Sequence, residues 1–60
     1  MTLPEAIARI EGLLAATVKD REWYRDQAIG GRKALWADAA ACAVRERAIR
    51  DALDLLRKVD

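Results

Sequence analysis

The stretch RKALWADAAACAVRERAIRDALDLLRK, residues 32–58, decides the fold. Alanine, leucine and arginine dominate it and neither glycine nor proline interrupts it, so it predicts one long α-helix. Its apolar residues recur at alternating spacings of four and three, the pattern of a helix that packs along a second helix. We call this line the seam: Leu35, Ala39, Cys42, Glu46, Ile49, Leu53 and Leu56.

A second line of small and apolar residues runs beside the seam on the same predicted helix. Its members are Ala34, Ala41, Ala48, Ala52, Leu55 and Val59, and Arg45 interrupts it. Two such lines are wider than one neighbouring helix can cover. The pattern therefore predicts self-association. The predicted oligomer interface consists of Leu35, Ala41, Ala48, Ala52, Leu55 and Val59.

A first helix is predicted over residues 3–29. Thr2 and Glu5 have the spacing of a capping box, in which each side chain accepts from the other residue's backbone amide, and Pro4 suits a first helical turn. The same four-three spacing continues through Leu3, Ile7, Ile10, Leu14, Thr17, Arg21, Tyr24 and Ala28. This helix therefore carries a matching seam.

Two adjacent glycines, Gly30 and Gly31, are expected to end the first helix, because glycine adopts the left-handed conformation that often follows a helix at no steric cost. The second helix is then expected to begin at Arg32, and so short a Gly-Gly turn makes the helices antiparallel. One register brings every large aliphatic seam residue opposite another, for example Leu14 opposite Ile49. The sequence thus predicts an all-α hairpin of helices 3–29 and 32–58, a single domain over residues 1–60, that pairs into a dimeric four-helix bundle or a higher oligomer.

The composition favours self-association as the means of stabilising so short a chain. A chain of 60 residues buries a smaller fraction of its surface than a longer chain does and usually needs an additional constraint. Cys42 is the one cysteine and histidine is absent, which excludes an intramolecular disulfide and a conventional structural zinc site. The apolar fraction is 53%, but thirteen of these residues are alanine, so we expect a thin core.

Charge and hydropathy argue against several classes of partner. Eleven basic and ten acidic residues nearly cancel, so no overall field attracts the chain to nucleic acid or to an anionic membrane. No apolar run approaches the roughly 20 residues that span a bilayer, and the first residues lack the charged start and apolar block of a signal peptide. Together with the unpaired cysteine, these features predict a cytoplasmic location.

Two polar residues of the seam, Arg21 and Glu46, are predicted to lie about one turn apart across the hairpin. One interpretation is an internal ion pair, whose best-attested use is to fix register and oligomeric state. The alternative is that both side chains reach solvent at the edge of the bundle. The sequence leaves both open.

A cluster of aromatic and basic residues is predicted at the turn. It consists of Trp23, Tyr24, Arg25, Arg32, Lys33 and Trp36. Aromatic rings stack on bases, guanidinium groups bind phosphate and the amides at a helix start attract anions, so the cluster suits a nucleotide-like ligand or an RNA element. The alternative is that the tryptophans fill space between alanine-rich helices while acidic neighbours such as Asp26 and Asp38 balance the solvated cations.

Little in the sequence supports catalysis. The chain has no histidine, no serine, no glycine-rich phosphate loop and no metal-ligand spacing, so we expect neither an enzyme nor a cofactor or metal site. The first functional hypothesis is a homo-oligomeric adaptor, inhibitor or regulator that presents a helical surface to another protein. The second is a module that captures a nucleotide or RNA at the turn-end cluster.

The predicted architecture resembles the short two-helix hairpins that dimerise into four-helix bundles, among them the plasmid copy-number proteins that bind paired RNA loops. The resemblance covers the whole chain and is one of architecture, without a shared motif. It implies a dimeric bundle and assigns no functional residue.

Overall fold

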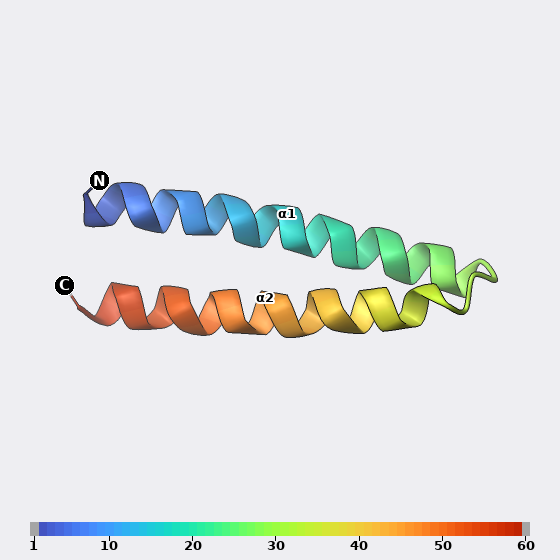
Figure 1. The fold of residues 1–60 in the computed structure, drawn as a ribbon. Helices are drawn as coiled ribbons and strands as arrows, with labels where there is room; N and C mark the ends of the chain where they lie inside the picture. Colours follow the sequence, from blue (N-terminus) through green and yellow to red (C-terminus); the bar gives the residue numbers. More distant parts are fainter. Residues whose placement is uncertain (1, 60) are drawn as a thin grey trace.

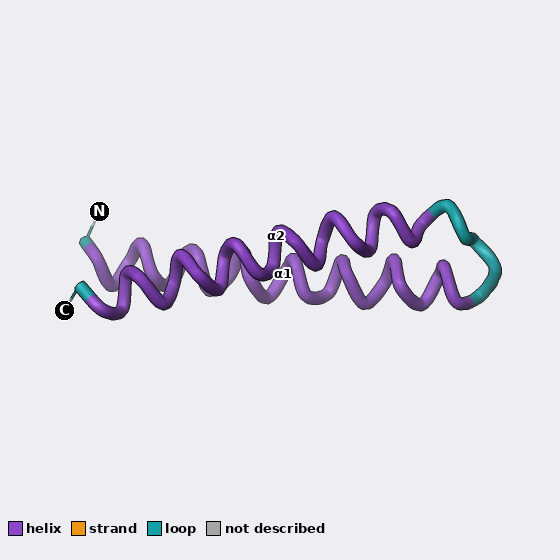
Figure 2. The backbone as a smooth tube through the Cα atoms, turned by 90° about the horizontal axis from the view of Figure 1, so that it is seen from below, coloured by secondary structure: helices purple, strands orange, loops and turns teal. Residues whose placement is uncertain are grey.

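In the computed structural model of the protein, residues 2–59 are described and form a hairpin of two α-helices. Helix α1 covers Leu3–Ile29 and helix α2 covers Leu35–Lys58. The helices run antiparallel and side by side, so the start of α1 and the end of α2 lie together opposite the turn (Figure 1). Seen from below, they cross at a shallow angle (Figure 2). The predicted helical hairpin is confirmed for these residues; Met1 and Asp60, the ends of the predicted domain, lie outside them.

Helix α1 begins where its capping residues predict. The Glu5 amide donates a hydrogen bond to Thr2 Oγ1 at 3.3 Å, and the Ala6 amide donates to the Thr2 carbonyl at 3.0 Å. Pro4 occupies the first turn, where the helix needs no amide donor. Local chemistry therefore fixes this end of the hairpin.

The connection between the helices is longer than predicted. The sequence suggests that α2 starts at Arg32, but it starts at Leu35, and residues 30–34 form the connection. Gly31 has a φ of +116°, and the amide of Arg32 donates back to the carbonyl of Gln27 at 3.1 Å. This is the bonding of a Schellman motif. Because the Arg32 amide closes the end of α1, the chain needs two further residues before α2 can begin.

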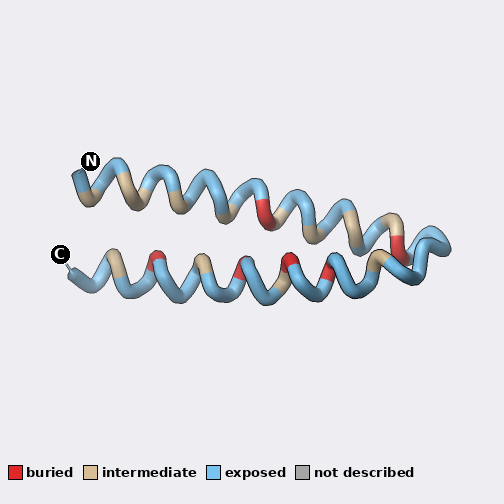
Figure 3. The backbone as a smooth tube through the Cα atoms, in the orientation of Figure 1, coloured by how far each residue is buried: buried red, intermediate tan, exposed pale blue. Residues whose placement is uncertain are grey.

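The core is a single line between the two helices (Figure 3). The buried residues of the described range are Thr17, Ala28, Ala39, Cys42, Glu46 and Leu53. All six belong to the predicted seam, and the other seam residues are half-buried. The seam prediction is therefore confirmed. Among the described residues no large side chain is fully buried, as expected of a thin core.

The hairpin is a rod with an unusually large surface for its mass. Its radius of gyration is 14.0 Å and its extents are 45 × 15 × 12 Å. A compact domain of this length has a radius of gyration of about 10 Å. The accessible surface is 4532 Å², whereas a compact protein of this mass exposes about 3900 Å². Two helices alone leave much of their apolar area in water.

Candidate functional site

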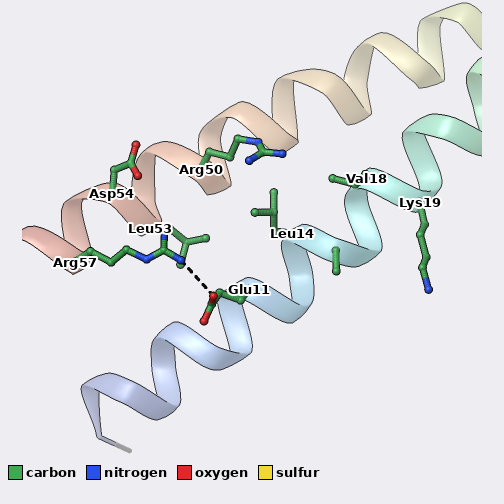
Figure 4. A pocket seen from close by; sticks show the side chains of 9 residues that line it. Glu11, Leu14, Val18, Lys19, Arg50, Leu53, Asp54 and Arg57 are labelled. Carbon is green, nitrogen blue, oxygen red and sulfur yellow. Dashed lines mark hydrogen bonds and ion pairs between the residues drawn. The ribbon is translucent and has the colours of Figure 1, made fainter.

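The seam divides the rest of the hairpin surface into two flanks. Arg57 Nη2 of α2 donates a hydrogen bond to Glu11 Oε2 of α1 at 3.2 Å, and this bridge lies on one of them (Figure 4). In an antiparallel helix pair, residues at equivalent heptad positions face the same side. The residues on the same side of the seam as Glu11 and Arg57 therefore form one flank. The residues on the other side of the seam form the second flank.

We call the side of the Glu11–Arg57 bridge the charged flank. It carries Ala8, Glu11, Ala15, Val18, Glu22 and Arg25 of α1 and Trp36, Ala40, Ala43, Arg47, Arg50, Asp54 and Arg57 of α2. A groove of about 580 Å³ lies there between the helices, with Leu14, Val18 and Leu53 among its apolar lining residues. Acidic and basic groups alternate along its rim, and the bridging pair is half-exposed. The rim therefore gives the groove no dominant charge, and such a pair contributes little stability.

We call the opposite side the apolar flank. It carries Ala6, Leu13, Ala16 and Trp23 of α1 and Ala34, Ala41, Ala48, Ala52, Leu55 and Val59 of α2. Leu55 is 65% exposed and Val59 is 75% exposed. Arg9, Asp20, Asp38 and Arg45 are its charged residues. Between these charges the flank exposes large apolar side chains and alanines, and exposed apolar surface of this kind marks an interaction site.

The predicted oligomer interface falls on this flank with one exception. Ala41, Ala48, Ala52, Leu55 and Val59 are all exposed there. Leu35 is half-buried instead, because it continues the seam between α1 and α2.

Sequence reasoning missed Leu13, which lies on the same flank, and Val44 on the outer side of α2; both are exposed. Val44 lies three residues after Ala41 and four before Ala48, so the spacing of apolar residues along the sequence indicates it. Leu13 becomes apparent once the register shows which sides of the two helices coincide.

The internal polar residues form one cluster at the middle of the seam. Glu46 Oε2 lies 3.4 Å from Arg21 Nη1, and Glu46 Oε1 lies 3.6 Å from Arg50 Nη2. The Glu46 side chain is 12% exposed and that of Arg21 is 35% exposed, so the acid is buried and the base reaches the edge. Thr17 donates its hydroxyl to the Leu13 carbonyl at 2.8 Å. Among the described residues, Glu46 Oε1 accepts no hydrogen bond. The guanidinium groups of Arg21 and Arg50 balance the charge of the Glu46 carboxylate.

The structure brings together part of the predicted turn-end cluster. The rings of Trp23 and Tyr24 meet edge to face with their centroids 5.1 Å apart. Trp36 lies on the charged flank, whereas Trp23 lies on the apolar flank, so the two tryptophans face different sides. They are 47% and 52% exposed. Sequence proximity to the turn does not fix the side on which a ring lies.

The cations of the turn-end cluster are Arg25, Arg32 and Lys33. All three are exposed, and they take part in none of the ion pairs among the described residues. Arg32 and Lys33 belong to the connection rather than to α2. An anion could reach them there together with Trp36.

Cys42, the one thiol, is buried in the seam. Among residues 2–59, no group of three potential metal ligands is placed to hold an ion. Over the same range, neither helix has the length and apolar character needed to cross a membrane. Comparison of the sequence with protein-family models, with curated proteins and with solved structures finds no match.

Proposed function

We propose that this chain is a small non-catalytic binding protein that self-associates and acts as an adaptor, inhibitor or regulator through a helical protein-interaction surface. The observation that carries the proposal is the apolar flank. Its exposed large residues, such as Leu55 and Val59, cannot be covered by the hairpin itself. Exposed apolar surface of this extent is characteristic of interaction sites.

The thin seam supports the same proposal. Leu53 is the one large aliphatic side chain among the buried residues of the described range, and the other buried seam residues are small or polar. Small cores of this kind gain stability from association, because a partner that binds the folded state shifts the folding equilibrium toward it. An oligomer also gives the exposed alanines of α2 a surface that can approach closely.

The mass of the full chain in solution tests the proposal. We expect light scattering behind size exclusion, at protein concentrations from micromolar to millimolar, to give a multiple of the 6.7 kDa chain mass. A helical monomer over that whole range would contradict it. Native mass spectrometry of the same samples separates a homo-oligomer from a complex with a second protein or a retained small molecule.

A second candidate function is binding of a nucleotide-like anion or an RNA element at the turn. The observation that favours it is the exposed Trp36 next to Arg32 and Lys33, cations outside the ion pairs of the described residues. Titration with ATP or a short RNA hairpin should quench Trp36 fluorescence, and raised salt should weaken binding. Trp23→Phe retains this signal and Trp36→Phe removes it. A signal unaffected by salt, or its persistence in Trp36→Phe, excludes the candidate.

The cytoplasm remains the proposed compartment. Cys42 is unpaired and buried, which is compatible with a reducing environment. Fluorescence microscopy of the tagged full chain in its own host tests this directly.

A further inference from the structure

Building on the proposed self-association, we infer that the apolar flank seats a second copy of this chain in a twofold dimer whose axis runs along the hairpin. In this dimer α2 of each copy lies antiparallel on α1 of the other. Both turns lie at the same end. The charged flanks face outward and keep their grooves accessible to other molecules.

The apolar line of α2 fits a helix as long as those of this chain. Its members are Ala34, Ala41, Ala48, Ala52, Leu55 and Val59, all of them exposed. The line therefore extends about 38 Å at 1.5 Å per residue. Helix α1 has 27 residues and α2 has 24. A second copy supplies two straight helices of this length, already held side by side, and the net charge of +1 opposes pairing little.

The surface area agrees with an interface of ordinary size. The hairpin exposes 4532 Å², about 600 Å² more than a compact protein of its mass. A standard interface buries about 800 Å² on each partner. The excess surface of the hairpin is thus of the same order as the area that one partner buries in a standard dimer.

The residues of the flank complement one another across this twofold axis. Leu13 of one copy faces Ala52 of the other, so a large side chain meets a small one. Trp23 faces Ala41 in the same way, and Ala16 faces Ala48. At the level of Asp20, the chain opposite presents Arg45. By the same spacing Leu55 lies opposite Arg9, whose long side chain can carry its charge to solvent, and the two central charges have opposite signs.

The reversed dimer, with the turns at opposite ends, is a poorer match. At full overlap it stacks α1 on α1 in opposite directions. Leu13 of one copy then lies beside Asp20 of the other. A carboxylate buried against leucine without a cation is costly. The order of residues along the flank therefore favours the arrangement with both turns together.

Two adjacent alanines provide a matched test of the face. Ala15 and Ala16 are both exposed on α1, and they lie on the charged and apolar flanks respectively. We expect Ala16→Glu to weaken dimerisation by at least about 100-fold, because each dimer then buries two new carboxylates. Ala15→Glu should change it by less than about threefold, since it adds the same charge at a solvated position. Sedimentation equilibrium measures both constants, with circular dichroism as a check on folding.

The outcomes separate this inference from the proposed function. A wild-type chain that is monomeric throughout contradicts both. A wild-type dimer that Ala15→Glu disrupts as strongly as Ala16→Glu leaves self-association standing and overturns the choice of face. The same pair of changes on α2, Ala40→Glu and Ala41→Glu, repeats the comparison in case one variant fails to fold.

Disulfide trapping tests the orientation. In a Cys42→Ala background, Ala16→Cys and Ala48→Cys chains are prepared separately and then mixed under oxidising conditions. We expect crosslinks mainly between the two different variants, because Ala16 of one copy faces Ala48 of the other and small residues allow the short approach that a disulfide requires. Crosslinking of each variant mainly with itself would show the reversed dimer.

Discussion

The two flanks of the hairpin share one seam and one pair of helices, yet they differ in the side chains that they expose to water. On the charged flank, long side chains reach solvent or each other, as in the Glu11–Arg57 bridge. On the apolar flank, Leu55 and Val59 are exposed among alanines. Folding of one chain therefore uses the seam alone. The apolar residues that remain are available to a partner.

Magnitudes show which flank can drive association. Full burial of a leucine side chain contributes about 1.5–3 kcal/mol. An exposed ion pair contributes about 0–1 kcal/mol. A few residues such as Leu13 and Leu55 therefore outweigh all the surface bridges of the charged flank. We expect the effect of a substitution to decrease from the seam to the polar cluster, the turn and the charged flank.

The largest expected difference in the free energy of unfolding is between substitutions of two leucines of α2. Leu53 in the seam is 2% exposed, and Leu53→Ala should lower the free energy of unfolding by about 2–5 kcal/mol at every protein concentration. Leu55→Ala on the apolar flank should cost less than about 0.5 kcal/mol in the monomer, and more where the dimer is populated. Urea denaturation at two protein concentrations measures both. A loss for Leu55→Ala that does not depend on concentration contradicts the role of the flank.

The next effect concerns the two partners of the polar cluster. Arg21→Met leaves a buried carboxylate with Arg50 alone and should cost about 1–3 kcal/mol. Glu46→Leu leaves two arginines that can extend into water, so it should be neutral or stabilising. Thermal unfolding of both variants compares them. A greater loss for Glu46→Leu than for Arg21→Met would show that the acid stabilises the fold.

The turn provides a smaller, matched contrast. Gly31→Ala places a side chain at a φ of +116° and should cost about 1–2 kcal/mol. Gly30 has a φ of −73°, which any residue can adopt. A Cβ at this position would lie 3.5 Å from the Asp26 and Gln27 carbonyl oxygens, an ordinary van der Waals distance, so Gly30→Ala should be tolerated. Both changes affect the unfolded chain similarly, and chemical denaturation measures the difference. Equal losses would contradict the Schellman ending of α1.

The smallest effect is on the charged flank. A double-mutant cycle with Glu11→Gln and Arg57→Met should give a coupling energy below about 1 kcal/mol, because both side chains are half-exposed. Molar salt should reduce it further. A coupling of several kcal/mol would place this bridge in a buried environment and reverse the assignment of the flanks.

The sequence predicts the features that depend on local chemistry or on period. The Thr2 cap, the seam and the antiparallel pairing follow from neighbouring residues and from repeats along one helix. The start of α2 does not, because the Arg32 amide bonds to a carbonyl of the preceding helix. Its correct position requires the three-dimensional form of the turn.

The candidate surface is predictable in part for the same reason. The line through Ala48 and Leu55 lies on one helix and is visible in the sequence. The contribution of Leu13 requires the pairing of two helices to be known. Trp23 and Trp36 are close in sequence to the turn, which predicts one cluster, yet their heptad positions place them on different flanks.

These two tryptophans permit the most direct test of the central claim, that association covers the apolar flank. Acrylamide quenching is measured for Trp23 alone in Trp36→Phe and for Trp36 alone in Trp23→Phe, from dilute to concentrated protein. We predict that quenching of Trp23 falls as concentration rises, while quenching of Trp36 stays constant. Protection of Trp36 instead, or constant quenching of both, would contradict the account.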